Sequence, residues 1–263
     1  MEEVIEKKSF GSKLKTAWNK VIHNPTFTIK EQVGFASGIM GNSMTQDVEA
    51  YVLTLFLARF MGIDSAVILI LMAVAKIVNI IVDPIAGVIL DKSTKSGRSI
   101  TKAMLLISPF PLAISSILLF IVPGLNLSAR IAYVFVFYLI YCIADGFYDM
   151  SMMTMSARMT TNPVDRKNFY TVAQLASTLG GMLPSGLIPI FVAIYMEYEA
   201  TIYLIFAIVF GLIGLGMMLV PYFTLKEKTA AKWRKPATVK LNFKALSLNK
   251  PMWLLIISNI ISS

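Results

Sequence analysis

Cysteine and histidine, which supply many metal centres and nucleophilic active sites, are almost missing from this sequence. Of its 263 residues, one is a cysteine, Cys142, and one is a histidine, His23. A single cysteine can form neither a disulfide within the chain nor a C-x-x-C site. The H-E-x-x-H and G-x-S-x-G patterns of metalloproteases and hydrolases are absent as well. The sequence therefore predicts no resident metal, no cofactor and no enzyme activity.

Charged residues are also scarce. They make up 15% of the chain, whereas hydrophobic residues make up 56%. A soluble domain has about 25% charged residues and cannot hide so much apolar surface in one core. We therefore expect a lipid bilayer to surround most of the chain.

Six apolar segments have the length of roughly 20 residues that a membrane-spanning helix needs. Polar or Pro/Gly breaks separate them, and they lie at 33–60, 65–90, 102–122, 130–157, 169–196 and 200–224. A seventh apolar run starts near Met252 and is too short, as far as Ser263, to cross a membrane by itself.

The predicted fold is therefore all-α, a polytopic six-helix half of a larger membrane protein. The helical bundle occupies residues 31–225, after a basic tail at 1–30. A basic central loop at 226–250 and a truncated seventh helix at 251–263 follow it.

Basic residues are distributed unevenly between the two ends of these helices. If the six helices alternate in direction, all but three of the 24 lysines and arginines lie at one end; the exceptions are Arg59, Arg130 and Lys76. Because basic residues concentrate in cytoplasmic loops, we expect a multi-pass protein of the cell membrane with a cytoplasmic N-terminus. The net charge of +9 then reflects topology and attraction to anionic lipid. No basic platform interleaved with aromatic residues indicates nucleic-acid binding.

Ionisable and polar side chains nevertheless fall inside the predicted spans. Lys76, Asn79 and Asp83 share one face of the second helix, and Asp145 and Asp149 share one face of the fourth. The first helix holds five polar residues within about two turns: Asn42, Ser43, Gln46, Asp47 and Glu49.

Such residues are costly at membrane depth, so they should face protein or a water-filled cavity. For any one of them, a structural hydrogen bond or ion pair without a transport role is an equal alternative. Acids on three separate helices favour a shared polar cavity. In the fifth helix, Ser177, Gly181 and Ser185 recur every four residues, which favours close packing against another helix.

Two motifs resemble the glycoside–pentoside–hexuronide:cation symporter branch of the major facilitator superfamily. DPIAGVILDKSTKSGR, at 83–98, is similar to the loop signature after the second helix, and YCIADGFYDM, at 141–150, resembles the fourth-helix pattern. A looser similarity runs from Gly34 to Gly62. The resemblance covers roughly residues 33 to 260.

This resemblance implies twelve helices in two halves, a sugar or glycoside substrate near mid-membrane, and symport by alternating access. It also implies a coupling ion, sodium or proton, held by Asp83 and Asp145. Asn79 stands where the family carries another acid. Because an amide brings no negative charge, proton coupling or the absence of coupling are alternatives to sodium.

The resemblance also suggests where substrate would bind. Ser43 stands in the position of the family's first-helix sugar-binding acid, and Asp47 lies one turn further along the same face. Lys76, Tyr148 and Asp149 are the other candidates. Within the loop signature, the residues expected to gate the cytoplasmic side are Gly87, Asp91, Lys92, Gly97 and Arg98.

The family's transport path lies between two halves, yet this sequence stops within the expected seventh helix. It could be a fragment of a longer protein, a truncated product or a half that assembles with a second chain. The partners expected are thus a sugar substrate, the lipid bilayer, and a missing C-terminal half or second chain. The alternative function is a non-transporting remnant, scaffold or sensor with the same fold.

Overall fold

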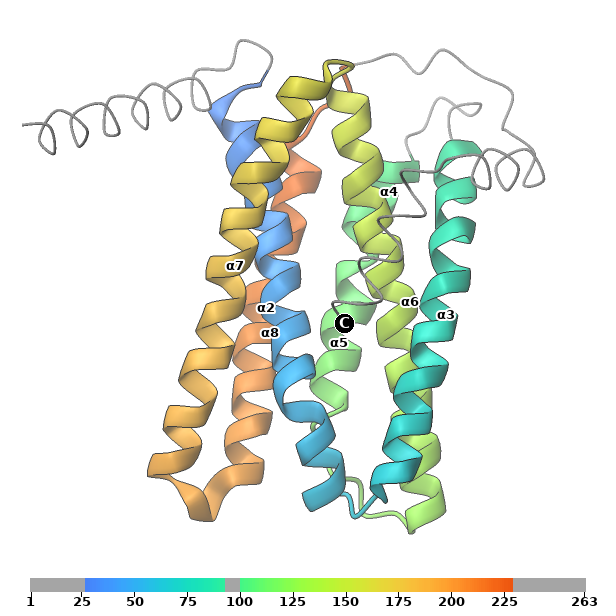
Figure 1. The fold of residues 1–263 in the computed structure, drawn as a ribbon, viewed down its shortest axis with the longest axis vertical. Coiled ribbons are helices and arrows are strands. Elements are labelled where there is room, and N and C mark those ends of the chain that lie inside the picture. Colours follow the sequence, from blue (N-terminus) through green and yellow to red (C-terminus); the bar gives the residue numbers. More distant parts are fainter. Residues whose placement is uncertain (1–26, 93–99, 229–263) are drawn as a thin grey trace, which may run out of the picture.

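The computed structural model describes residues 27–92 and 100–228, and every regular element in these ranges is helical (Figure 1). The helices are α2 (Ile29–Arg59), α3 (Ser65–Lys92), α4 (Ile100–Ile107), α5 (Pro109–Leu118), α6 (Leu127–Met159), α7 (Pro163–Ile194), the 3₁₀ turn η2 (Met196–Tyr198) and α8 (Glu199–Thr224). Successive spans run in opposite directions along one bundle, so α2 begins at the end where α8 finishes. The prediction of an all-α bundle is confirmed.

Five segments in the described ranges are long and apolar enough to cross a membrane. They are Ser65–Leu90, Ile100–Leu118, Leu127–Met159, Pro163–Ile194 and Met196–Thr224. The first predicted span forms the 31-residue helix α2 but is not among the five. Acids and amides in the middle of α2 lower its hydropathy, and the same residues build the site described below.

The third predicted span differs from expectation because it is not one uninterrupted helix. It divides into α4 and α5 at Ser108, where Pro109 and Pro111 follow. Each proline lacks the N–H that would bond to the carbonyl four residues earlier, so the regular hydrogen-bond ladder is interrupted. Backbone bonds on either side, from Ser108 N to Met104 O and from Leu112 N to Ser108 O, keep the two pieces nearly continuous.

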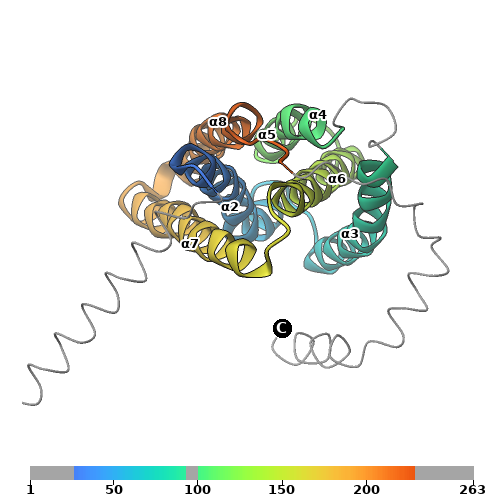
Figure 2. The same cartoon turned by 90° about the horizontal axis from the view of Figure 1, so that it is seen from above.

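The helices pack as two groups, which Figure 2 shows from above. In the first group α2 packs on α7 and α8, and in the second α6 packs on α3, α4 and α5. Contacts between α5 and α8 join the groups on one side. The backbones of α2 and α6 meet at few points, so side chains bridge the space between these two helices.

Glycines allow α2 and α8 to approach closely. A Cβ atom at Gly41 would lie 2.7 Å from the carbonyl oxygen of Gly214, and one at Gly214 would lie 2.7 Å from Oγ1 of Thr45. A neighbouring backbone atom cannot move aside as a flexible side chain can. Small residues at this crossing therefore set the distance between the two helices.

Charged contacts tie α2 to the chain beyond α8 at the end where α2 begins. Thr28 and Glu31 form a capping box, and Nζ of Lys228 lies 2.6 Å from Oε2 of Glu31. Arg158, 8% exposed, donates to the carbonyl of Leu90 at 3.0 Å and pairs with Glu227 at 3.1 Å. These contacts link the ends of α2, α3, α6 and α8.

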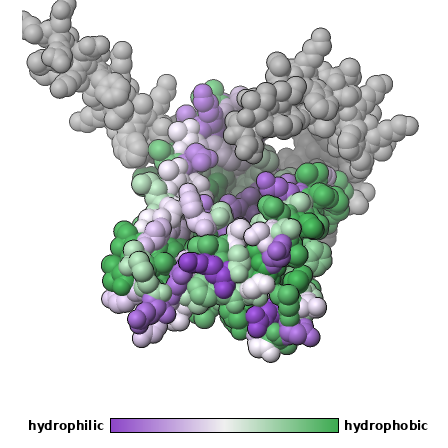
Figure 3. Space-filling view, turned by 60° about the horizontal axis from the view of Figure 1, so that its bottom comes forward, coloured by the Kyte–Doolittle hydropathy of each residue, from purple (hydrophilic) through white to green (hydrophobic). Residues whose placement is uncertain are grey.

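The opposite end carries the two basic residues that the topology predicts there. Arg59 pairs with Glu199 at 2.7 Å. Arg130 donates to the carbonyls of Leu125 and Met61. Figure 3 brings this end forward: hydrophobic residues cover much of the flanks, and hydrophilic residues gather across the end. The arrangement confirms the alternation on which the charge argument rests.

Some predicted regions lie outside the described residues. They are most of the basic tail, nearly all of the central loop, the seventh helix, and positions 93–99 with Gly97 and Arg98.

Replacing Gly41 with alanine should destabilise the bundle, because the new methyl group meets the backbone of α8. Overpacking of this kind costs about 1–3 kcal/mol. Gly216, also on α8, has nothing within 4 Å of the position that a methyl group would take, so Gly216→Ala is the matched control. Thermal unfolding in detergent should show a lower midpoint for Gly41→Ala only. Equal midpoints for both variants would contradict the close approach.

Acid should weaken the contact between Glu31 and Lys228. Burial alone would raise the pKa of Glu31, but hydrogen bonds from Lys228 and Thr28 outweigh it and leave the pKa below its ordinary value of 4.5. A carboxyl whose pKa is depressed in the folded state contributes stability above its ordinary pKa and loses it as the pH falls through the folded pKa. Thermal midpoints should therefore fall more steeply below pH 4.5 in the wild type than in Glu31→Gln. Glu197→Gln, at an exposed site, should keep the wild-type slope.

Candidate functional site

Two pairs of polar side chains bridge α2 and α6 inside the bundle. Nδ2 of Asn42 donates to Oδ1 of Asp149 at 2.8 Å. Nε2 of Gln46 donates to both carboxylate oxygens of Asp145, at 2.9 and 3.1 Å. The two helices are antiparallel, so residues four apart on each helix meet in matching order. We call these four residues the α2–α6 seam.

Burial changes across the seam. Asn42 is 4% exposed, Gln46 and Asp145 are half-buried, and Asp149 is exposed. Oδ1 of Asn42 is buried without a hydrogen-bond partner, although the amide nitrogen of the same side chain is used. The seam therefore runs from the packed interior of the bundle to an open face.

The second-helix acid lies against this seam. Asp83 is exposed, and its Oδ1 is 3.0 Å from the position of a Cβ atom at Gly146, the residue after Asp145. Glycine at 146 thus lets the Asp83 carboxylate approach α6. Asn79, one turn earlier on α3, has a buried Oδ1 without a partner. The structure brings together the two acids that the motifs single out.

These acids have no basic partner in the parts of the chain that the structure describes. The three ion pairs found there lie at the ends of the bundle, between Arg59 and Glu199, Arg158 and Glu227, and Lys228 and Glu31. In residues 27–92 and 100–228, no group of three His, Cys, Asp or Glu side chains is placed to hold a metal ion. Asp145 and Asp149 accept hydrogen bonds from amide donors instead, and Asp83 is exposed.

A second polar contact joins α2 to α7. The hydroxyls of Ser43 and Ser177 lie 2.6 Å apart, and a Cβ atom at Gly181 would overlap the Asp47 carboxylate. The predicted close-packing face of the fifth helix is confirmed at Ser177 and Gly181, and its partner is α2. Two candidate substrate residues, Ser43 and Asp47, therefore lie on the face of α2 that contacts α7. The seam residues lie on a different face, which contacts α6.

Other candidates lie elsewhere. Tyr148 is fully buried, and its hydroxyl donates to the carbonyl of Met218 at 3.1 Å, so it packs between α6 and α8 rather than with Asp149. Lys76 is exposed and forms no ion pair within the described ranges. A substrate role for either residue stays a prediction.

Part of the expected gating signature is helical. Gly87 lies within α3, where a methyl group would make only an ordinary 3.4 Å contact with Met150. Asp91 and Lys92 are the last two residues of α3, because the apolar run continues to Leu90. The other two gating residues, Gly97 and Arg98, lie outside the described residues.

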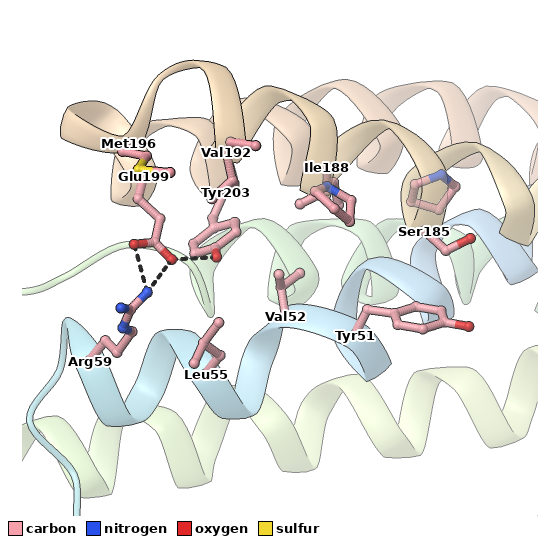
Figure 4. A pocket seen from close by; sticks show the side chains of 13 residues that line it. Tyr51, Val52, Leu55, Arg59, Ser185, Ile188, Val192, Met196, Glu199 and Tyr203 are labelled. Atoms are coloured by element: carbon pink, nitrogen blue, oxygen red, sulfur yellow. Dashed lines mark hydrogen bonds and ion pairs between the residues drawn. The ribbon is translucent and has the colours of Figure 1, made fainter.

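An elongated cavity of about 670 Å³ lies between α2, α7 and α8, toward the end that holds Arg59 (Figure 4). Tyr51 and Ser185 stand at one end, and Arg59, Glu199 and Tyr203 stand at the other. Apolar residues, including Leu55, Ile188 and Val192, line the space between. Tyr51 lies one turn beyond Asp47 on α2, so the cavity continues the α2–α7 contact outward.

A sequence model of the family described as MFS/sugar transport protein matches residues 34–263. The chain belongs to this family. Among its relatives, the uncharacterized symporter YjmB of Bacillus subtilis (strain 168) is 25% identical over 250 residues, covering 93% of this chain and 54% of the relative. The isoprimeverose transporter of Lactiplantibacillus pentosus is 23% identical, covering 90% and 50%.

A third relative, the uncharacterized symporter YnaJ of Bacillus subtilis (strain 168), is 23% identical, covering 88% of this chain and 50% of the relative. The chain thus spans about half the length of the curated relatives it matches. The family assignment confirms the resemblance seen in the motifs at 83–98 and 141–150. It also makes the chain a multi-pass membrane protein, in agreement with its apolar helices.

The motifs singled out neither of the two α2 residues of the seam, Asn42 and Gln46. Gln46 is the partner of Asp145. The sequence feature that could have indicated the two pairings is the spacing of four residues between Asn42 and Gln46, which matches the spacing of Asp145 and Asp149. Ser177, the partner of Ser43, was recognised as a packing residue only.

The stability effects of Gln46→Leu and Asp145→Leu should be strongly coupled. Hydrogen bonds to charged groups contribute about 1.5–3 kcal/mol, and removing one partner leaves the other unsatisfied. A double-mutant cycle on thermal unfolding in detergent measures this coupling. The control cycle combines Gln46→Leu with Asp149→Leu, because Asp149 bonds to Asn42 and not to Gln46. Equal coupling in the two cycles would contradict the pairing.

Proposed function

We propose that the protein containing this chain is a secondary transporter that moves a sugar or glycoside across the cell membrane by alternating access, with its N-terminus in the cytoplasm. The observation that carries the proposal is the meeting of Asp83 and Asp145, from two helices, beside an open face of the bundle. Carboxylates at membrane depth without basic partners mark ion and substrate pathways. Family membership supports the same reading.

Substrate binding is assigned to the polar side chains on either side of α2. Asp149 is exposed at the open end of the seam, and its carboxylate can accept hydrogen bonds from sugar hydroxyls. Asp47 and Ser43 offer further acceptors and a donor on the α7 side. The α2 helix thus presents polar groups on two faces, which suits a polyhydroxylated ligand bound next to it.

Coupling is assigned to Asp83 and Asp145. Two neighbouring carboxylates repel each other, and a proton or a sodium ion between them removes part of that repulsion. Binding the ion therefore lowers the cost of covering the open face beside these acids. Asn79 can contribute its unpartnered amide oxygen, but no charge. The presence of Asn79 where the family carries an acid favours the alternative function, a non-transporting relative with the same fold.

A complete path requires more than this bundle. The chain covers about half of its relatives, so a C-terminal half or a second chain supplies the other wall of the transport path. The signature at 83–98, from Asp91 to Arg98, is assigned to gating on the cytoplasmic side. The charged contacts of Glu31, Arg158 and Lys228 lie at that same end of the bundle.

Uptake of labelled glycosides by vesicles, with and without a sodium or proton gradient, tests the proposal on the complete protein. Asp83→Asn and Asp145→Asn should each reduce gradient-driven uptake by about tenfold or more, because each removes one of the two coupling charges. Glu197→Gln, at an exposed turn, is the control and should transport normally. Unchanged uptake in both aspartate variants would remove these residues from coupling.

A further inference from the structure

The cavity between α2, α7 and α8 is separate from the α2–α6 seam. The seam residues of α2 bond to α6, whereas one wall of this cavity is α8, which contributes nothing to the seam. Tyr51 and Ser185 stand at the inner end of the cavity (Figure 4). One turn further in, a Cβ atom at Gly181 would overlap the Asp47 carboxylate, so α7 touches α2 there and closes this end.

The wall of the cavity is mostly apolar, and the cavity is open to the outside of the bundle. Leu55, Ala193 and Met196 line it and are exposed, Met196 to 73%. The other aliphatic residues of the wall are Val52, Ile188 and Val192. Such a wall gives water few hydrogen-bond partners, and a volume of about 670 Å³ is that of a ligand site. The surroundings thus favour an apolar occupant.

A charged cluster lies at the outer end of the cavity. Nη1 of Arg59 donates to both carboxylate oxygens of Glu199, at 2.7 and 2.8 Å, and the Tyr203 hydroxyl donates to Oε1 of Glu199 at 2.6 Å (Figure 4). Among the described residues, Arg59 bonds through Nη1 alone, so its Nη2 and Nε can donate to a further acceptor. The side chain of Arg59 is 57% exposed. Glu199 therefore orients a guanidinium that still has donors to offer.

This cluster lies at the level of lipid head groups. Tyr195 and Tyr198, in the turn between α7 and α8, are 53% and 62% exposed. Tyrosine is enriched at the membrane–water interface, where its ring meets lipid and its hydroxyl meets water. Glu199 follows Tyr198 directly, so the pair of Arg59 and Glu199 lies at that interface. An apolar cavity that ends there at an arginine matches an acyl chain that ends at a phosphate.

We infer that this cavity binds a zwitterionic phospholipid, with an acyl chain along the apolar wall and the phosphate at Arg59. A guanidinium donates two parallel hydrogen bonds to phosphate. A phosphate beside Arg59 and Glu199 gives two negative charges against one positive charge. The ammonium group of a zwitterionic head group supplies the missing positive charge.

This inference goes beyond the proposed function. It needs the membrane setting of the bundle, which family membership and the apolar helices supply. It needs neither a direction of insertion nor any transport, because the site faces away from the seam that holds Asp145 and Asp149. Failure of the transport proposal would leave it standing.

Native mass spectrometry of the complete protein, incubated in mild detergent with phosphatidylethanolamine, tests the site. The wild type should retain this lipid, and Arg59→Gln should bind it about tenfold more weakly, because a charge-assisted hydrogen bond is lost. Arg130→Gln is the matched control, since Arg130 lies at the same end but donates to backbone carbonyls. Arg130→Gln should retain the lipid. Equal retention by all three proteins, or equal loss in both variants, would overturn the inference.

A second variant leaves the ion pair of Arg59 and Glu199 intact. Ala193→Phe places a ring in the cavity and should displace the acyl chain, whereas Ala132→Phe, at an exposed position of α6, should not. Retention in Ala193→Phe at the wild-type level would contradict an acyl chain in the cavity. A wild type that retains no lipid would overturn the inference, as expected if the other half of the protein covers this face.

The head group is tested by replacing phosphatidylethanolamine with phosphatidylglycerol, which has a phosphate but no ammonium. The wild type should retain phosphatidylglycerol less, because the negative charge beside Glu199 then stays uncompensated. Equal retention of the two lipids would overturn the assignment of a zwitterionic head group.

Discussion

The cost of placing charge in lipid governs the arrangement of this bundle. A charged side chain at the centre of a bilayer costs about 2.5–3.5 kcal/mol on insertion scales, so each acid must find a donor, a cavity or a proton. The amides of Asn42 and Gln46 donate hydrogen bonds to Asp149 and Asp145. The consequence is a helix, α2, that is less apolar than its neighbours. That helix therefore lies at the centre, between α7 and α8 and opposite α6.

Two kinds of contact hold α2 in place, and they act in different directions. Glycines bring it within backbone contact of α8 where Gly41 crosses Gly214, whereas only side chains reach across to α6. Ion pairs fix its two ends, through Glu31 with Lys228 and through Arg59 with Glu199. The α2–α8 pair is thus a firm unit, and the α2–α6 seam depends on a few hydrogen bonds. A seam of that kind can rearrange when a proton, an ion or a substrate changes the charge of Asp145 or Asp149.

Much of this architecture could be predicted from the sequence because the bilayer imposes strong local rules. Spans of about 20 apolar residues and the one-sided distribution of lysine and arginine indicated the number, order and direction of the helices. The motifs at 83–98 and 141–150 singled out Asp83 and Asp145, and the structure brings these two together. The break at Ser108 could have been anticipated from Pro109 and Pro111. The family and its relatives agree with the sequence-based interpretation.

Helical spacing says which residues share a face, but it does not say which neighbour that face meets. Tyr148 illustrates this: it follows Asp145 by three residues, yet its hydroxyl reaches α8 and not the polar face. Gln46 likewise acquires its partner, Asp145, only when α6 is placed antiparallel to α2. The sequence by itself determined the membrane environment, the topology and the acids of interest, since these follow from hydropathy and charge along one chain. Tertiary structure alone decided which donor meets which acid, because that depends on the rotation and depth of helices far apart in the sequence.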